Sequence, residues 1–275
     1  MQNNTIINKI IIVAGASGGI GGSVVKELSN LCANVIAVYN QTHPDFKVDR
    51  NISLIKADLS KSEEWERVLD FVSQKYKKLD VLINCAGILI PGDFLIQSEE
   101  QINKMINVNL SSVLIGTQKS LKLMKRQKFG HIINIGSIGG IIPMPYSSVY
   151  SATKFALRGF THSLSQELKG SEVKISLISP GPVNTKMLKL EADHYKTAIA
   201  FISKTIESEV VADIVLKVIN KHKAEVIVPS LLSIPSKVAF LFPGLFSKAY
   251  SLIEKIGLWR KKFYIRRKFG LSLQK

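Results

Sequence analysis

Residues 9–21 read Lys-Ile-Ile-Ile-Val-Ala-Gly-Ala-Ser-Gly-Gly-Ile-Gly, an apolar run that breaks into a cluster of glycines. The β-branched run predicts a buried strand, and the glycines predict a tight turn that opens a helix. Free backbone N–H groups at such a helix N-terminus attract phosphate, and glycines let a pyrophosphate come close to the backbone. This stretch therefore predicts a nucleotide-binding strand–turn–helix unit.

Outward from this unit, apolar strand-like runs alternate with helix-length amphipathic segments. The predicted strands span 9–14, 35–39, 52–57, 81–84, 131–136, 174–179 and 225–228, and the predicted helices span 20–30, 62–76, 98–127, 148–168 and 207–221. Strands that are apolar on both faces and separated by helices indicate a parallel sheet covered on both sides. We predict an α/β fold with a doubly wound, seven-stranded parallel sheet of Rossmann type, whose ligands bind at the carboxyl ends of the strands. The crossover 40–51 lacks a helical period and is predicted to be a loop.

The pattern changes after Val228, where Pro229 begins an apolar and then basic segment. We predict a catalytic domain over 1–228 and a helical C-terminal extension over 229–275. Residues 230–275 hold ten basic residues and one acidic residue, Glu254. The charge of this segment, 10 − 1 = +9, is more than half of the net charge of +16. We expect the core of the catalytic domain to be nearly complete without this extension.

The extension is too short and too interrupted, at Pro235, Lys237 and Pro243, to cross a bilayer. One interpretation is an interfacial anchor that contacts an anionic membrane, since Trp259, Phe263 and Tyr264 alternate with basic residues. The other is a pair of helices docked over the active-site mouth or in a dimer interface. No nucleic-acid-binding motif accompanies the charge. We therefore predict no nucleic-acid partner. We also predict a cytoplasmic homo-oligomer, with peripheral membrane contact and packing on the body as the two alternatives for the extension.

Two cysteines and five scattered histidines give neither a disulfide framework nor the spacing of a metal site. We predict no metal. The apolar run after Lys9 could begin a signal peptide, but the glycine turn behind it favours a buried strand, and we predict no export signal.

Four polar side chains stand out between residues 109 and 154. Tyr150 and Lys154 are four apart on a predicted helix and project from one face. Ser137 follows a buried strand at the functional edge of the sheet, and Asn109 lies in the long helix before that strand. Asp58, Asn84–Gly87 and Pro180–Thr185 follow three other strands.

Together these motifs resemble the short-chain dehydrogenase/reductase superfamily over residues 9 to about 228, with the glycine spacing Gly-x-x-x-Gly-x-Gly. The resemblance implies that Tyr150 is the proton donor or acceptor, that Ser137 orients the substrate oxygen, that Lys154 binds the nicotinamide ribose, and that Asn109 holds a water in a proton relay. Tyrosine ionises near pH 10. A nearby ammonium favours tyrosinate, so Lys154 is predicted to lower the pKa of Tyr150.

The resemblance also implies a set of cofactor-binding residues around the pyrophosphate, the adenosine and the nicotinamide. They are Gly15, Ser17, Gly19, Ile20, Gly21, Asn40, Asp58, Leu59, Asn84, Ala86, Gly87, Tyr150, Lys154, Pro180, Gly181 and Thr185. Cys85 replaces the second Asn of the family's Asn-Asn-Ala-Gly motif. The second strand ends at Asn40, where a carboxylate would select NAD and repel a 2′-phosphate. Its absence favours NADP(H) over NAD(H), with Lys47 or Arg50 as further contacts from the loop.

We therefore predict an NAD(P)-dependent enzyme that interconverts a carbonyl and an alcohol. Apolar residues after Thr185 and around Ile138 and Met144 favour a reductase of a lipophilic ketone, aldehyde or acyl substrate. An epimerase or dehydratase on the same scaffold is the alternative enzyme. A cofactor-sensing, membrane-associated protein without catalysis is a third reading, which the four catalytic side chains oppose.

Overall fold

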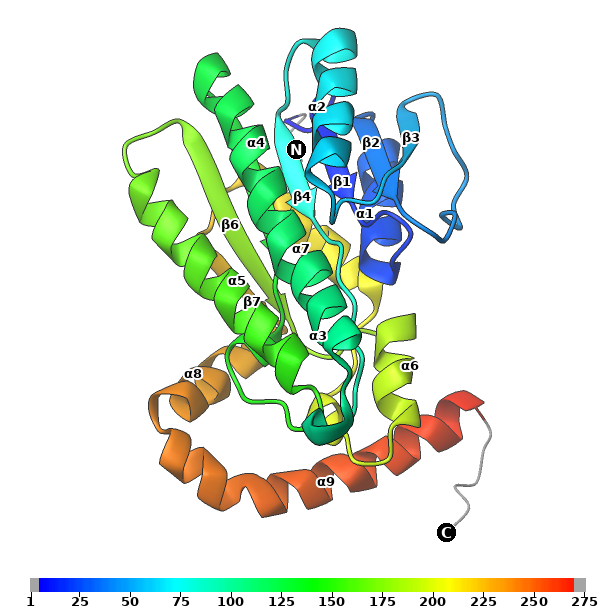
Figure 1. Ribbon diagram of the computed structural model, residues 1–275, viewed down its shortest axis with the longest axis vertical. Helices are drawn as coiled ribbons and strands as arrows, with labels where there is room; N and C mark the ends of the chain where they lie inside the picture. The colour runs from blue at the N-terminus through cyan, green and yellow to red at the C-terminus, as the bar shows by residue number, and fades with distance from the viewer. Residues whose placement is uncertain (1–4, 270–275) are drawn as a thin grey trace.

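The computed structural model describes residues 5–269 and is built on a parallel sheet of seven strands in the order β3-β2-β1-β4-β5-β6-β7 (Figure 1). The strands are β1 (Ile10–Ala14), β2 (Asn34–Tyr39), β3 (Ile52–Lys56), β4 (Val81–Asn84), β5 (Gly130–Ile135), β6 (Val173–Pro180) and β7 (Glu225–Val228). Each prediction of a strand from the sequence is confirmed to within two residues at either end. The predicted doubly wound sheet is confirmed as well.

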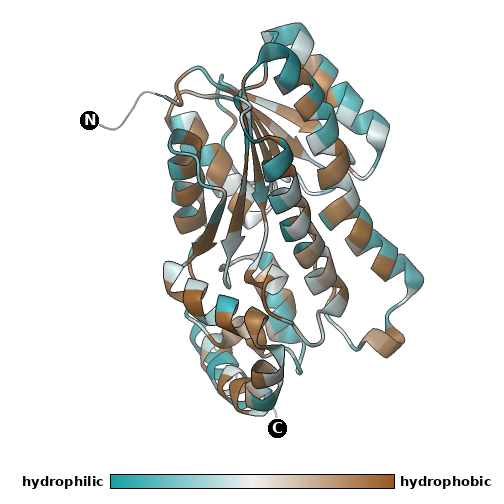
Figure 2. Ribbon diagram, turned by 90° about the vertical axis from the view of Figure 1, so that its left-hand side faces the viewer, coloured by the Kyte–Doolittle hydropathy of each residue, from teal (hydrophilic) through white to brown (hydrophobic). Residues whose placement is uncertain are grey.

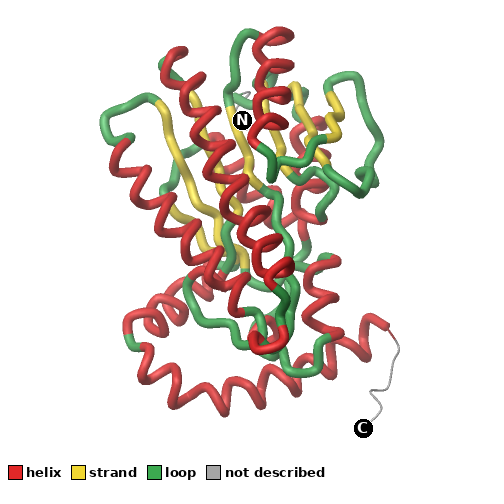
Figure 3. The backbone as a smooth tube through the Cα atoms, in the orientation of Figure 1, coloured by secondary structure: helices red, strands yellow, loops and turns green. Residues whose placement is uncertain are grey.

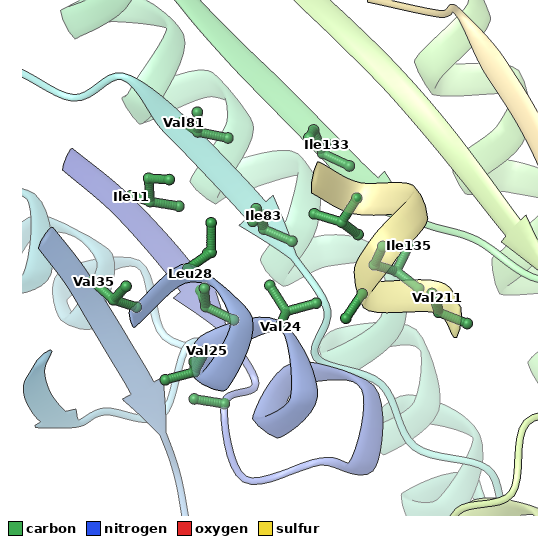
Figure 4. Close-up of a cluster of buried hydrophobic side chains, with 14 of the residues drawn as sticks. Ile11, Val24, Val25, Leu28, Val35, Val81, Ile83, Ile133, Ile135 and Val211 are labelled. Carbon is green, nitrogen blue, oxygen red and sulfur yellow. The ribbon is translucent and has the colours of Figure 1, made fainter. Parts of the chain in front are cut away.

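Helices cover both faces of the sheet. One face carries α1 (Gly19–Asn30) and α7 (Ser208–Asn220), and the other carries α2 (Ser62–Tyr76), α4 (Ser112–Gln127) and α5 (Ser148–Glu167). Figure 4 shows the cluster under α1, in which Val24 and Leu28 lie against Ile11, Val35 and Ile83 of three neighbouring strands. All five of these side chains are buried. The apolar runs therefore become the core because water is excluded from both faces of the sheet.

The segment predicted as one helix over 98–127 is divided in the structure. A capping box formed by Ser98 and Gln101 begins α3 (Glu99–Ile106), a π-helical stretch follows at Asn107–Ser111, and α4 continues from there. A π-helical turn inserts an extra residue into the ladder, which a hydrophobic period cannot reveal, and such turns often occur at functional sites. The predicted loop over 40–51 is confirmed (Figure 3).

The strand order reverses between β1 and β4. At such a point the carboxyl ends of the two strands leave room between them for a ligand. Gly15 follows β1 with φ +88°, and a Cβ built on it would lie 2.6 Å from the Cα of Ala86, which follows β4. A side chain at position 15 would clash with this backbone. Glycine is therefore required here both by its backbone conformation and by the close approach of two strand ends.

Beyond β7 the chain forms α8 (Ser233–Leu241) and the long helix α9 (Pro243–Phe269), which passes beneath the carboxyl edge of the sheet (Figure 1). There α9 packs against α6 (Lys186–Asp193) and the short helix η4 (Ile199–Phe201), neither of which was predicted. The contact is close, since a Cβ on Gly257 would lie 2.4 Å from the carbonyl oxygen of Ala198. Lys275, which was counted in the basic extension, lies outside the described residues.

A hydrophobic cluster joins this extension to the catalytic domain. Buried Ile265 of α9 lies in it together with Tyr150, Leu188 and Phe201, and Phe246 and Tyr250 pack at its border. Of the buried apolar residues that the structure describes, Ile265 is the one from the extension, so the expectation that the core is nearly complete without residues 229–275 stays a prediction. Apolar side chains of the extension therefore pack in the same cluster as Tyr150. Over residues 5–269, no helix has the length and apolar character needed to cross a membrane.

A substitution at Gly116 would test how closely α4 packs on α2. A Cβ at this position would lie 2.2 Å from the indole ring of Trp65, which is fully buried. We expect Gly116→Ala to lower the free energy of unfolding by about 1–3 kcal/mol, because an overpacked core forces the backbone or the ring to move. Gly159 of α5 is the matched control, since nothing lies within 4 Å of its built Cβ. Gly159→Ala should instead stabilise the protein by roughly 0.5–1 kcal/mol, through helix propensity. Urea denaturation measures both, and equal stabilities of the two variants would contradict this packing.

Candidate active site

Tyr150 and Lys154 lie in the first turns of α5, and both side chains are buried. The ammonium of Lys154 donates a hydrogen bond of 3.0 Å to the carbonyl oxygen of Ile135, at the end of β5. It lies 5.8 Å from the ring centre of Tyr150. Ser137 follows the same strand, and its side chain accepts from the backbone N–H of Gly139 at 3.0 Å. The structure therefore brings the predicted Ser, Tyr and Lys side chains to one strand end.

Burial controls the protonation of this group. The pKa of Tyr150 is raised to about 12, mainly by burial; the hydrogen bond with Ser137 acts against the rise, and the Glu191 carboxylate adds to it. Burial also lowers the pKa of Lys154 to about 8. The predicted lowering of the Tyr150 pKa by Lys154 is therefore wrong in this structure. Both groups lose hydration, and for Tyr150 that loss outweighs the hydrogen bond with Ser137, which acts in the opposite direction.

Asn109 lies in the π-helical turn and is completely buried. Its side-chain oxygen accepts from the N–H of Ile88 at 2.7 Å, and its amide donates to the carbonyl of Ile88 at 2.8 Å. A Cβ on Gly87 would lie 3.6 Å from this side-chain oxygen and 3.7 Å from the ammonium of Lys154. Asn109 thus clamps the segment after β4 beside Lys154. The water relay implied for it stays a prediction.

The glycine turn has the form required to hold a phosphate. Helix α1 begins at Gly19, and among the described residues no side chain caps its first turn. A Cβ at Gly21 would lie 2.2 Å from the carbonyl oxygen of Gly15, so the turn is closed tightly. Ser17 and Ile20 are partly exposed on this turn. The free N–H groups and the helix dipole therefore favour an anion at this point.

The remaining predicted contacts divide into two groups. Asn40 is exposed after β2, and Asp58 is partly exposed, with one carboxylate oxygen accepting 2.8 Å from the hydroxyl of Ser60. Leu59 is buried in the core under α2. Asn84 is also buried, and its amide donates to the side-chain oxygen of Asn134 at 2.9 Å. The side chains of Leu59 and Asn84 therefore hold strands and helices together, whereas Asn40 and Asp58 remain open to a ligand.

A wall formed by the end of β6 faces the glycine turn. A Cβ on Gly19 would lie 2.6 Å from the methyl group of Thr185, so the two segments nearly touch. Gly181 donates to the carbonyl of Val228 at 2.6 Å, and a Cβ on it would lie 2.7 Å from Leu232 of the extension. Pro180, Gly181 and Thr185 were predicted to form this wall, and all three line the same cavity.

This cavity, of about 90 Å³, lies between the glycine turn, the catalytic side chains and α6. Its lining includes Ser137 and Tyr150 on one side and Leu188 and Glu191 on the other. Sequence reasoning missed Glu191. Only the apolar residues after Thr185 had been interpreted, and no helix had been predicted over 186–193, so nothing indicated which side chains turn inward.

A parallel sheet with a glycine turn at its switch point, and a Ser, Tyr and Lys group beside that turn, defines a dinucleotide-dependent oxidoreductase. A family model described as short chain dehydrogenase matches residues 9–196, and the chain belongs to this family. The protein is therefore an oxidoreductase of that family.

Individual relatives agree with this assignment. The chain is 34% identical to an uncharacterized oxidoreductase of Staphylococcus saprophyticus, over 71% of this chain and 86% of that protein. It is 29% identical to farnesol dehydrogenase of Aedes aegypti, over 77% of this chain and 90% of that protein. Among solved structures, ElxO with NADP bound is similar with a TM-score of 0.72 and 26% identity, covering 82% of this chain and 99% of ElxO. A short chain dehydrogenase/reductase of Burkholderia phymatum in complex with NAD shares the fold, with a TM-score of 0.75 and 18% identity, covering 88% and 96% of the two chains.

Replacement of Tyr150 by Phe removes the phenol hydroxyl and keeps the ring that fills the buried cluster. We expect kcat to fall by about 10²–10⁴-fold, the usual contribution of a general acid, with the Kd for the cofactor nearly unchanged. Turnover and cofactor fluorescence measure the two effects. Tyr146→Phe, which removes a hydroxyl four residues earlier in the chain, is the control and should retain full activity. Retention of more than roughly a tenth of kcat in Tyr150→Phe would show that another group supplies the proton.

Proposed function

We propose that the protein is an NADP(H)-dependent reductase of a lipophilic ketone, aldehyde or acyl substrate. The observation that carries the proposal is the convergence of Ser137 and Tyr150 on a cavity with otherwise largely apolar walls. The walls include Leu89, Ile138, Met144, Met187 and Leu188. Such a cavity binds a carbonyl group through few polar contacts and its chain through apolar ones.

The side chains of this site suit a proton transfer to oxygen. Ser137 holds the substrate carbonyl oxygen, and Tyr150 delivers its phenol proton to that oxygen as the carbonyl carbon is reduced. NADPH, when bound, supplies the hydride. A Tyr150 pKa raised to about 12 keeps the phenol protonated at neutral pH, which favours the reductive direction. The ammonium of Lys154 then attracts the tyrosinate that is left behind.

The relative from Aedes aegypti, named farnesol dehydrogenase, supports a lipophilic substrate. The cofactor preference is supported by Asn40, which leaves the end of β2 without a carboxylate. In the loop that follows, Phe46 packs beside α1, where it lies 3.9 Å from a Cβ built on Gly22. This contact holds the loop beside α1, and the next residue, Lys47, is exposed to solvent. A cation there would attract the 2′-phosphate that distinguishes NADP from NAD.

A panel of aliphatic ketones and aldehydes, assayed with NADPH and with NADH, tests this function. We expect a higher kcat/KM with NADPH, and we expect Asn40→Asp to reverse the preference, because a carboxylate repels the 2′-phosphate and accepts from ribose hydroxyls. Labelled hydride should appear in the released alcohol. Return of the label to the cofactor, with an inverted or dehydrated product, would instead indicate an epimerase or a dehydratase. A strong wild-type preference for NADH would contradict the NADP(H) assignment.

We also propose that the outer side of the extension contacts an anionic membrane. Helix α9 exposes a row of apolar side chains at helical spacing, and η5 (Ser230–Leu232) and α8 continue it. This outer face comprises Leu231, Ile234, Leu241, Phe242, Leu245, Leu252, Ile256, Trp259 and Phe263. Figure 2 shows hydrophobic and hydrophilic residues interleaved along these helices. Exposed Lys248, Lys255 and Lys262 accompany the row and attract anionic lipid headgroups.

Sedimentation with anionic and neutral vesicles tests this contact without removing the helix that covers the site. We expect Trp259→Ser/Phe263→Ser to lose binding to anionic vesicles and to keep activity, since both side chains are more than half exposed. Phe129→Ser, on an exposed residue before β5, is the control and should bind as wild type does. High salt should weaken binding by screening the basic residues. A wild-type protein that ignores vesicles, but whose oligomeric state depends on Trp259 and Phe263, would assign the face to a second copy of the chain and overturn the membrane proposal.

A further inference from the structure

Glu191 is a buried carboxyl group that the reaction above does not use. It lies in the last turn of α6, is 6% exposed and lines the same cavity as Ser137 and Tyr150. Among the described residues that line this cavity, it is the one with an acidic side chain. Its Oε1 atom is fully buried and has no hydrogen-bond partner among the residues of the structure. Because burial of an unpaired carboxylate is unfavourable, this arrangement indicates a ligand group that completes it.

The nearest cation of the protein is fixed elsewhere. Lys261 of α9 is buried, and its ammonium donates to the carbonyl oxygens of Glu191 at 2.8 Å and of Thr197 at 3.2 Å, and also to that of His194. These bonds hold the carboxyl end of α6 at the cavity and are made to backbone carbonyls, not to the carboxyl group of Glu191. Lys261 therefore positions Glu191 and does not neutralise it by a direct hydrogen bond.

The charges around Glu191 indicate which kind of ligand group would pair with its carboxylate. Burial raises the pKa of Glu191 to about 7, with Lys261 opposing the rise. The charged form of Glu191 in turn raises the pKa of Tyr150, which opposes release of the phenol proton. A cation between the two would stabilise both the carboxylate and the tyrosinate. A neutral hydroxyl group could satisfy the hydrogen bond of Glu191 but would leave its charge uncompensated.

We propose that Glu191 binds a substrate ammonium group that lies next to the carbonyl held by Ser137 and Tyr150. The substrate class is then an amino ketone with an apolar chain, and the product is the corresponding amino alcohol. In this reaction the hydride adds to the carbonyl carbon, the Tyr150 proton goes to the carbonyl oxygen, and the ammonium keeps its protons. This inference rests on the proposed reductase function and narrows its substrate.

Two ketones of the same shape test it. Decyl dimethylaminomethyl ketone carries an amine that is protonated at neutral pH, and decyl isobutyl ketone carries a CH group in place of the nitrogen. We expect wild-type kcat/KM to favour the amino ketone by about tenfold or more, the value of one hydrogen bond between charged partners. Glu191→Gln keeps the size of the side chain and should remove this preference, so that the ratio of the two kcat/KM values falls to about one. Asp193→Asn, on an exposed carboxylate of the same helix that is paired with Lys189, should retain the preference.

Calorimetry separates the inference from the reductase function. In the presence of NADPH, the amino alcohol and the alcohol of the same shape without the nitrogen can bind but cannot react. Tighter binding of the amino alcohol that is lost in Glu191→Gln supports the inference, even if neither ketone is reduced and the reductase proposal fails. Equal reduction of both ketones with equal binding of both alcohols leaves the reductase function standing and overturns the inference. An equal loss of both activities in Glu191→Gln, or no binding of the amino alcohol, overturns it as well.

Discussion

The hydrogen bond from the buried ammonium of Lys154 to the carbonyl of Ile135 ties α5 to the end of β5. It spans 19 residues of sequence and fixes the helix at the strand end where the chain turns toward Ser137. Tyr150, one turn before Lys154, is thereby placed beside that serine. The segment after β4 reaches the same point, since Asn109 clamps Ile88 and Gly87 lies near the ammonium. Three separate parts of the chain therefore meet around one buried cation.

A second buried lysine performs a similar task for the other wall of the cavity. Lys261 of α9 binds the backbone carbonyls at the end of α6, and Gly257 allows α9 to approach Ala198 closely. An ammonium at a helix C-terminus is favoured by the helix dipole as well as by these carbonyls. The C-terminal extension is consequently part of the site, because it decides how α6 faces Tyr150. Its inner side contributes Ile265 to the core, and its outer side remains apolar and exposed.

Burial shifts the pKa values of the acidic and the basic groups in this site in opposite directions. It raises the pKa of Tyr150 to about 12 and that of Glu191 to about 7, and it lowers the pKa of Lys154 to about 8. Each shift favours the neutral form, as expected where water is excluded. The site is thus suited to hold a proton on Tyr150 until charge develops on a substrate oxygen. A cationic substrate group beside Glu191 would assist at that step.

The sequence by itself determined the sheet and the glycine turn, because these depend on local features, namely apolar period and glycine conformation. The Ser137, Tyr150 and Lys154 group was predicted from its resemblance to a family motif, with helical spacing placing Tyr150 and Lys154 on one face. The π-helical turn at Asn109 was not predicted, because one inserted residue barely changes a hydrophobic pattern. The direction of the Tyr150 pKa shift, the inward position of Glu191 and the docking of α9 were decided only by the tertiary structure. Each depends on contacts between residues that are distant in the sequence. Lys261, for example, donates a hydrogen bond to the carbonyl oxygen of Glu191, 70 residues earlier. No local window contains such a contact, so only the folded chain could show which side chains it buries together.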